Sequence, residues 1–313
     1  MSEDRRVDRP AYSKLMKAIK KGEFVFSGEL EPEKQTSIDD LIKSANAMKE
    51  YVLAANVTDG PQSMAYACSL ACSHLVQKKT GLETVYQMTV RDRNRIGLEA
   101  DVLGASILGI RNILSLTGDH TALGDTPGAK PVFDLDSAQF VHLMSKMIDE
   151  GTDFSGRKIH GQVKINVAVA ANPNAVPREP EIIKVERKVY CGADFIQTQT
   201  AFDIDQAKSF LKDLEYLNCP VLLGIFPLKN YGIANYFDKY IPGVSVPKDL
   251  LADLKKTKKI DDKAKRKEKI DEINIEFFIP LINEIKKTTK AAGVHCMAVK
   301  YERLFKPLLS RIK

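Results

Sequence analysis

The segment Phe24-Val25-Phe26-Ser27-Gly28-Glu29-Leu30-Glu31-Pro32 joins an apolar run to a loop that begins with a carboxylate. A strand end carries its side chain to the rim of a sheet, where a cleft can form and a carboxyl group can donate a proton. Three later apolar runs also end in polar residues, at Gln87-Met88-Thr89, Thr117-Gly118-Asp119 and Gln197-Thr198-Gln199. Polar side chains at successive strand ends, on one side of a sheet, indicate the active site of a barrel enzyme.

Strand-like and helix-like segments alternate along the whole chain. The strand-like runs lie near 24–30, 52–57, 83–89, 112–117, 161–170, 194–198, 220–226 and 293–298. The stretches with helical periodicity lie near 38–49, 63–79, 95–108, 138–149, 182–190, 205–217, 270–292 and 302–312. Strands separated by helices pair in parallel through right-handed crossovers. This pattern predicts an α/β protein, a (βα)8 TIM barrel that forms a single domain over residues 1–313, with a helical insertion near 247–290 before the last strand.

Composition limits the class of protein. The chain has 313 residues, 44% of them apolar, which is enough for one large α/β domain. No apolar run approaches the roughly 20 residues that a membrane span needs. The charged start at residues 1–6 has no apolar signal core behind it, so we expect a cytoplasmic protein. No Gly-x-Gly-x-x-Gly follows the first strand, which argues against a dinucleotide-binding open sheet.

The formal net charge of +6 is concentrated in a lysine-rich segment at 255–269. This segment contains no aromatic residue that could stack on a base, so a solvated surface is favoured and nucleic-acid binding is not expected. A docking patch for an acidic partner is the alternative. The five cysteines include one close pair, Cys68 and Cys72, but no second pair stands nearby. Reduced thiols are therefore favoured, and no metal site is predicted.

A barrel would bring the polar strand-end residues together, because all its β-to-α loops open on one face. These residues are Glu29, Thr58, Gln87, Asp119, Asn172, Gln199 and Tyr231. Each has a structural alternative. Gly118-Asp119 and the segment at 58–61 could be turns, Glu29 a capping or salt-bridged carboxylate, and Tyr231 a packing residue. Their common position at strand ends favours a site, because unrelated turn residues have no reason to converge.

A family resemblance rests on several of these pieces taken in order. They are Gly28-Glu29-Leu30-Glu31-Pro32, Asn56-Val57-Thr58, Leu116-Thr117-Gly118-Asp119, Arg187-Lys188-Val189, Thr198-Gln199 and Gly224-Ile225-Phe226-Pro227. Together they resemble methylenetetrahydrofolate reductase from about residue 15 to 300. The short chain is similar to the bacterial form. Its segments Lys21-Gly22-Glu23-Phe24 and Gly293-Val294-His295-Cys296-Met297 are most similar to the enzymes of anaerobes that use the reductive one-carbon pathway.

The resemblance implies a flavin-dependent enzyme that reduces 5,10-methylenetetrahydrofolate to 5-methyltetrahydrofolate. Glu29 would be the general acid that protonates folate N10, and Asp119 would lie near the pterin and the flavin and favour the cationic iminium. Gln199 would bind the folate or nicotinamide through its amide, and Tyr231 would stack over the substrate. The flavin-binding residues that the resemblance implies are Thr58, Gln87, Leu116, Thr117, Gly118, Asp119, Phe133, Asp134, Asn172, Glu181, Arg187 and Lys188.

The same resemblance leaves several alternatives open. FAD is the family's usual cofactor, but Gln87, Thr117 and Asn172 depart from residues common in the family, so FMN is the alternative. The electron donor would be NADH or a protein, such as a partner subunit that carries an iron–sulfur cluster or zinc, and a homo- or hetero-oligomer is expected. Two rival functions remain: another pterin-binding barrel, such as a methyltetrahydrofolate methyltransferase domain, and a non-catalytic subunit of such a complex.

Overall fold

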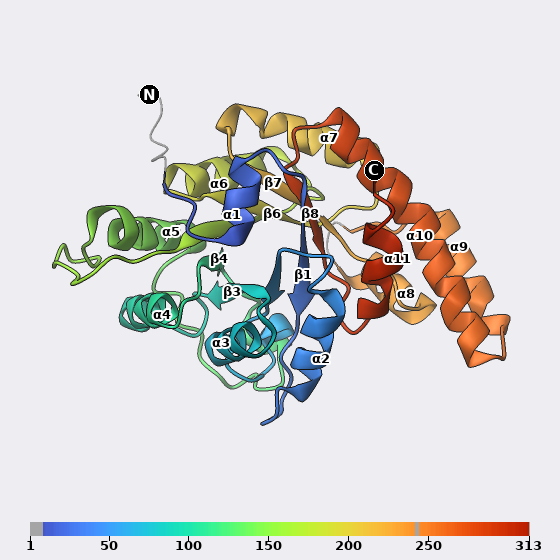
Figure 1. Cartoon of the computed structure of the whole chain (residues 1–313), viewed down its shortest axis with the longest axis horizontal. Helices are drawn as coiled ribbons and strands as arrows, with labels where there is room; N and C mark the ends of the chain where they lie inside the picture. The colour runs from blue at the N-terminus through green and yellow to red at the C-terminus, as the bar shows by residue number, and fades with distance from the viewer. Residues whose placement is uncertain (1–8, 242–243, 313) are drawn as a thin grey trace.

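The computed structural model describes residues 9–241 and 244–312, and its centre is a closed barrel of eight parallel strands (Figure 1). The strands pair in chain order, and β8 returns to pair with β1. Their bounds are β1 (Val25–Leu30), β2 (Ala54–Val57), β3 (Glu83–Thr89), β4 (Asn112–Leu116), β5 (Asn166–Ala171), β6 (Phe195–Thr200), β7 (Val221–Ile225) and β8 (Gly293–Cys296). The predicted TIM barrel is confirmed, although the fifth strand begins at Asn166 and not near residue 161.

The helices surround the barrel. They are α1 (Lys14–Lys20), α2 (Asp39–Met48), α3 (Ser69–Thr80), α4 (Arg95–Ile107), α5 (Ser137–Ser145), α6 (Glu179–Tyr190), α7 (Ile204–Asp213), α8 (Tyr231–Tyr240), α9 (Lys248–Lys256), α10 (Lys263–Thr288) and α11 (Phe305–Leu309). A π-helical turn, Lys146–Glu150, extends α5. The sequence pattern did not predict α1, and it placed the start of α3 six residues early.

Several helices begin at a side chain that caps them. Asn94, Asp136, Asp203, Asn230 and Asp262 each accept a hydrogen bond from a backbone N–H in the first turn of the helix that follows. Such caps satisfy donors that have no partner within the helix, and they fix where each loop ends. Four of these five caps stand in loops that follow barrel strands, so the local sequence determines where each of these loops ends and the next helix begins.

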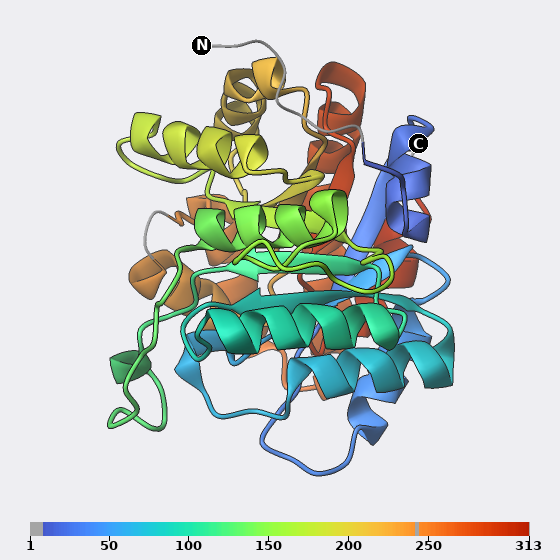
Figure 2. The same ribbon diagram turned by 90° about the vertical axis from the view of Figure 1, so that its left-hand side faces the viewer.

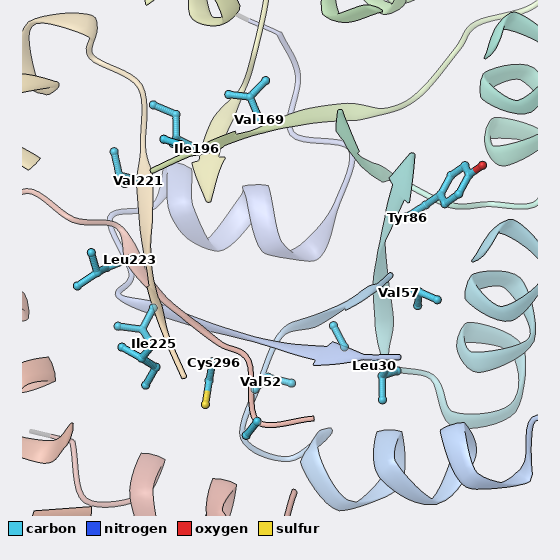
Figure 3. Packing of buried hydrophobic residues seen from close by; sticks show 14 of the residues in the cluster. Leu30, Val52, Val57, Tyr86, Val169, Ile196, Val221, Leu223, Ile225 and Cys296 are labelled. Atoms are coloured by element: carbon cyan, nitrogen blue, oxygen red, sulfur yellow. The ribbon is translucent and has the colours of Figure 1, made fainter. Parts of the chain in front are cut away.

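The main hydrophobic core lies between the barrel and its helices. Outward-facing strand residues such as Val57, Tyr86, Val169 and Leu223 pack against the inner faces of the helices (Figure 3). Because strand side chains alternate, the residues between them point into the barrel. The side chains that fill the barrel interior are therefore separate from the core between the barrel and its helices.

The helix α1 closes the end of the barrel at which the strands begin. Leu15, Met16 and Ile19 of this helix pack against the innermost apolar ring of the strands, which includes Leu114 and Phe195. Glu83 and Asn166 fasten the helix to the strands. The carboxylate of Glu83 accepts hydrogen bonds from the backbone N–H groups of Lys14 and Leu15, at 2.7 and 3.1 Å. The amide oxygen of Asn166 accepts from the backbone N–H groups of Tyr12 and Ser13.

The predicted helical insertion consists of α9 and α10, at one side of the barrel in Figure 1. Asn274, buried in the middle of α10, donates to the carbonyl of Leu228 and accepts from the same residue's N–H at 2.7 Å. Its amide also lies 3.3 Å from the hydroxyl of Tyr301, beyond β8. The insertion thereby fixes the loops that follow β7 and β8. Between residues 9 and 312, leaving aside 242–243, no helix has the length and apolar content of a membrane span.

Candidate active site

A cavity of about 310 Å³ lies inside the barrel, at the end opposite α1. Its size lies at the lower end of the range for small-molecule sites. The lining comes from the strands and the loops after them: Glu29, Asn56, Gln87, Leu114, Leu116, Ala170, Ala171, Asn172, Glu181, Lys188, Gln197, Thr198, Gln199, His295 and Met297. The long loop after β4 extends from this end, on the side opposite α1 (Figure 2). The cavity therefore lies at the carboxyl ends of the strands, where TIM-barrel enzymes have their sites.

Glu29 lies in this cavity, on β1, between two polar side chains of other strands. Its Oε2 accepts a hydrogen bond from Nε2 of Gln87, on β3, at 3.2 Å. The same oxygen lies 3.4 Å from Nε2 of His295, on β8, and 14% of the Glu29 side chain is exposed. The carboxyl group is thus held from two sides and still reaches the cavity. Two of the predicted site residues, Glu29 and Gln87, are in direct contact.

A buried polar network continues below Glu29. Nδ1 of His295 lies 2.9 Å from the hydroxyl of Ser27, two residues before Glu29 on the same strand. That hydroxyl lies 3.5 Å from Nε2 of Gln197, and Gln197 and Asn56 exchange two amide hydrogen bonds at 2.9 and 3.1 Å. Ser27, Asn56, Gln197 and His295 are all almost completely buried. A satisfied network of this kind fixes side-chain positions, and here it determines the position of the imidazole that contacts Glu29.

A β-bulge in β6 shapes another wall of the cavity. Gln197 pairs with Leu222 but Thr200 pairs with Gly224, so β6 has an additional residue between these positions. Gly224 leaves room for the bulged backbone, because a Cβ there would lie 2.2 Å from the carbonyl oxygen of Thr198. The bulge places Gln199 at the cavity, where its amide oxygen accepts from the N–H of Thr200 at 2.9 Å. The amide nitrogen of Gln199 has no hydrogen-bond partner in the part of the chain that the structure describes, so a ligand could bind it.

Three further predicted residues meet on the β5 side of the cavity. Glu181, on α6, accepts a hydrogen bond from the backbone N–H of Asn172 at 2.8 Å. Lys188, two turns later on α6, donates to the carbonyl of Ala170 at 2.7 Å. Burial lowers the pKa of Lys188, and the negative charge of Glu181 opposes that shift. An ammonium group held at an apolar wall can contribute a positive charge to an anionic ligand.

Other predicted residues lie outside the lining of this cavity. Asp119 is exposed in the loop after β4, where its Oδ2 accepts from the backbone N–H of Gln62 at 2.7 Å. Tyr231 begins α8, and the ammonium of Lys258 lies 4.5 Å from its ring centroid. Thr58 is buried after β2, and its hydroxyl has no hydrogen-bond partner within the described residues. An unpartnered buried hydroxyl fits a site that a polar ligand completes.

The remaining predicted flavin residues lie around the loop after β4 and on α6. Thr117 is exposed, with its hydroxyl 3.4 Å from that of Ser137, and Gly118 has a φ of 87°. Phe133 is 37% exposed. The last two residues of this group form ion pairs within the protein. Asp134 pairs with Arg95, and Arg187 pairs with Asp136 at 3.0 Å. Hydrogen bonds from Arg95 lower the pKa of Asp134 to about 2.

Four of the five described non-glycine residues with positive φ lie around the same end of the barrel, and the fifth, Asn218, precedes β7. Gln62, Ser63, Phe133 and Lys300 have positive φ angles between 41° and 57°, and all four lie in loops after β2, β4 or β8. Non-glycine residues adopt this region at a cost, and such residues concentrate at functional sites. The strained loops and the cavity therefore mark one functional end of the molecule.

Ser27, Asn56, Gln197 and His295 were not predicted as site residues. Their signal in the sequence is weak: Asn56 and His295 are single polar residues in short strands that are otherwise apolar or small, and Ser27 and Gln197 share their strands with other polar residues. Period-two alternation identifies such inward positions. It does not show that four of them, from β1, β2, β6 and β8, meet in one network.

The fold and the position of the cavity place this chain among the (βα)8 barrels whose sites open at the carboxyl ends of the strands. A more specific assignment comes from the family model for methylenetetrahydrofolate reductase, which matches residues 14–313. The chain belongs to the methylenetetrahydrofolate reductase family. The resemblance expected from the sequence motifs is confirmed.

Individual relatives are distant. The chain is 27% identical over 197 residues to 5,10-methylenetetrahydrofolate reductase of Buchnera aphidicola, covering 62% of this chain and 60% of that protein. It is 24% identical over 311 residues to methylenetetrahydrofolate reductase 2 of Schizosaccharomyces pombe, covering 92% and 45%. The match to methylenetetrahydrofolate reductase (NADH) 1 of Arabidopsis thaliana, at 23% identity, covers 70% and 38%. The chain thus matches less than two thirds of the length of each of these relatives.

A solved structure shares the fold over almost the whole chain. It is an uncharacterized protein from Clostridium thermocellum, described as binding two copies of 5-methyl-5,6,7,8-tetrahydrofolic acid. The TM-score is 0.61 at 14% sequence identity, and the match covers 95% of this chain and 99% of the other.

Proposed function

We propose that this protein reduces 5,10-methylenetetrahydrofolate to 5-methyltetrahydrofolate with a bound flavin, and that Glu29 is its general acid. The observation that carries the proposal is the position of Glu29, in the cavity at the carboxyl end of the barrel and in contact with Gln87 and His295. Family membership supports the reaction, and the Clostridium thermocellum protein supports the barrel's capacity to bind a reduced folate.

The general acid has a defined task in this reaction. The five-membered ring of the folate opens to an iminium when N10 is protonated, and N10 is only weakly basic. A carboxyl group held in a partly buried site is suited to deliver that proton. Gln87 and His295 fix the carboxyl group, so that little orientational freedom has to be lost when substrate binds.

The cavity residues are chemically suited to a flavin. Leu116, Ala170 and Ala171 provide an apolar wall, while Gln87 and Asn172 place amide groups at its edges. Flavin supplies the hydride chemistry when it is bound. Glu181 and Lys188 would bind its polar chain. We propose FAD as the cofactor because the family to which the chain belongs suggests it, with FMN as the alternative.

Asp119 and Tyr231 enter the proposal at the rim. The carboxylate of Asp119 would favour the cationic iminium from the loop after β4, and Gln199 would bind the folate or nicotinamide through its amide nitrogen. Tyr231 would approach the substrate from the start of α8. NADH or a reduced partner protein would supply electrons. These roles require the rim loops to close over the ligand, as loops at this face of a barrel commonly do.

The half-reaction with product tests the proposal without any assumption about the electron donor. Purified protein carrying oxidised flavin is mixed anaerobically with 5-methyltetrahydrofolate, and the flavin absorbance is followed. We expect the visible absorbance to bleach as the folate is oxidised. Protein that binds flavin but does not bleach contradicts the proposal. Protein purified without flavin, which binds the folate and does not take up FAD or FMN, would favour the methyltransferase-type alternative.

A further inference from the structure

A second carboxyl group, Glu31, lies beside the proposed general acid and has no role in the chemistry described so far. It follows β1 directly, two residues beyond Glu29. Successive side chains alternate along an extended chain, so residues 27, 29 and 31 project toward the same side. Ser27 and Glu29 both project into the barrel interior, where they contact His295. Glu31, the next position of this alternation, follows the end of β1 at the mouth of the barrel and is not among the residues that line the cavity.

Glu31 is half-buried, yet its carboxyl group has no hydrogen bond or ion pair with any described residue. The lysine that would neutralise it, Lys300, is already paired with Glu33. Lys229 also faces this region, but its ammonium donates to the carbonyl of Val299 at 3.4 Å. A half-buried carboxyl group without a partner is costly to keep unless it has a function.

The charged and titratable groups around Glu31 come from several elements. Glu29 lies on β1 and Glu33 in the loop after it, Tyr66 lies before α3, and Lys229 and Lys300 lie after β7 and β8. Burial raises the pKa of Glu31, and the charge of Glu29 raises it further, while Lys300 and Lys229 act in the opposite direction. A carboxyl group with a raised pKa holds its proton at higher pH and can exchange it with a neighbour.

We propose that Glu31 is a proton relay between Glu29 and solvent, an inference that rests on the proposed function. In the direction of folate reduction, Glu29 gives its proton to N10 and becomes a carboxylate. The O–H bond of Glu31 then breaks, directly or through one water, as a new O–H bond forms on Glu29. Glu31 regains a proton from solvent. No electron is transferred in these steps, and the reverse sequence carries the N10 proton outward when 5-methyltetrahydrofolate is oxidised.

The relay predicts a difference between the first turnover and later ones. In the Glu31→Gln variant, the single bleaching of flavin by 5-methyltetrahydrofolate should proceed at nearly the wild-type rate, because Glu29 can accept one proton alone. Steady-state oxidation with a quinone as electron acceptor should slow about tenfold or more, since each cycle must discharge Glu29. The Glu31→Asp variant and added acetate should each restore part of the steady-state rate.

The matched control is Glu23→Gln, which removes an exposed carboxylate just before β1 and should leave both rates near wild type. Wild-type steady-state turnover in Glu31→Gln overturns the relay. An equal loss of the first and later turnovers, with no rescue by acetate, also overturns it, because that pattern indicates a structural role. Failure of the wild-type protein to bleach contradicts the proposed function itself. Bleaching together with normal turnover of Glu31→Gln contradicts only the relay.

Discussion

Glu29 and His295 meet across the seam of the barrel, with Oε2 of the carboxyl group 3.4 Å from Nε2 of the imidazole. The two residues lie 266 positions apart in the sequence, on the first and last strands. The register Ser27↔His295 between β1 and β8 places the imidazole beside both Ser27 and Glu29. Closure of the barrel is therefore what completes the surroundings of the proposed general acid. A defect in this pairing should affect catalysis more than cofactor binding.

The first prediction concerns His295. In the variant His295→Asn, Glu29 loses one of its two contacts, so the rate of flavin bleaching by 5-methyltetrahydrofolate should fall about 10–100-fold. The dissociation constant for flavin should change little, because Glu29 is the contact that is lost. Stopped-flow absorbance and fluorescence titration measure the two quantities. A loss of flavin affinity with an unchanged bleaching rate would contradict the role given to His295.

Ser27 provides a test of whether the network acts as a unit. Ser27→Ala removes the partner of His295 Nδ1 at 2.9 Å, and we expect a smaller rate loss than for His295→Asn. The double variant should be no slower than His295→Asn alone, because Ser27 acts through the imidazole. Multiplied losses in the double variant would show that the two residues act independently.

The third prediction concerns the bulge in β6. Gly224→Ala would place a Cβ 2.2 Å from the carbonyl oxygen of Thr198 and 2.7 Å from that of Gln199. The bulge must move, so we expect a loss of about 1–3 kcal/mol in the free energy of unfolding and weaker folate binding through Gln199. Gly128→Ala is the matched control, because its added Cβ would have no neighbour within 4 Å. Equal stability of both variants would contradict the steric argument.

The helix α1, which closes the end of the barrel at which the strands begin, should stabilise the fold without taking part in the chemistry. Leu15 is completely buried against the inner ring of the strands. Leu15→Ala should lower the free energy of unfolding by about 2–5 kcal/mol, as measured by denaturant titration, while folded protein retains its bleaching rate. Lys17→Ala, at an exposed position of the same helix, should have almost no effect on stability.

We expect Lys188 to lower the stability of the folded apoprotein and to strengthen its binding of the cofactor. Burial lowers its pKa, so the folded protein releases this proton at a lower pH than the unfolded chain does. Below the folded-state pKa the penalty is fully present, and it is relieved as the pH rises toward the unfolded value. Lys188→Met should therefore retain the melting temperature of the apoprotein or raise it, and weaken flavin binding by at least about tenfold.

The control for that variant is Lys184→Met, one turn earlier on α6. Lys184 is exposed, and its ammonium lies 4.0 Å from Glu181, so the exchange should alter flavin binding only slightly. A fall in flavin affinity for Lys184→Met as large as for Lys188→Met would contradict a specific role for the buried ammonium.

The sequence was a good guide to the barrel and to part of the site. The eight strand-like runs correspond to the eight strands, although the fifth begins five residues later than expected, and Glu29, Gln87, Asn172 and Gln199, which were expected at strand ends, line one cavity. The short helix α1 was missed because its seven residues are too few for a clear periodic pattern, and its position depends on contacts with Glu83 and Asn166 from distant strands.

The buried network was not predictable from the sequence either, and the reason is different. His295 stands in a short strand, and only the closure of β8 on β1 brings it to Glu29 and Ser27. Local patterns identify inward positions, but the contacts of an inward polar residue depend on strand register. For the same reason, the sequence pattern did not show that the carboxylate of Asp119 is exposed on the rim, hydrogen-bonded to the N–H of Gln62.

The rate of flavin bleaching by 5-methyltetrahydrofolate in the Glu29→Gln variant is the most direct measurement. If residue 29 handles the N10 proton, the rate should fall about 10²–10⁴-fold below wild type, with flavin binding and melting temperature unchanged. Glu23→Gln, at an exposed position just before β1, should bleach like wild type. A Glu29→Gln protein that keeps its flavin and bleaches at the wild-type rate would contradict the proposed mechanism.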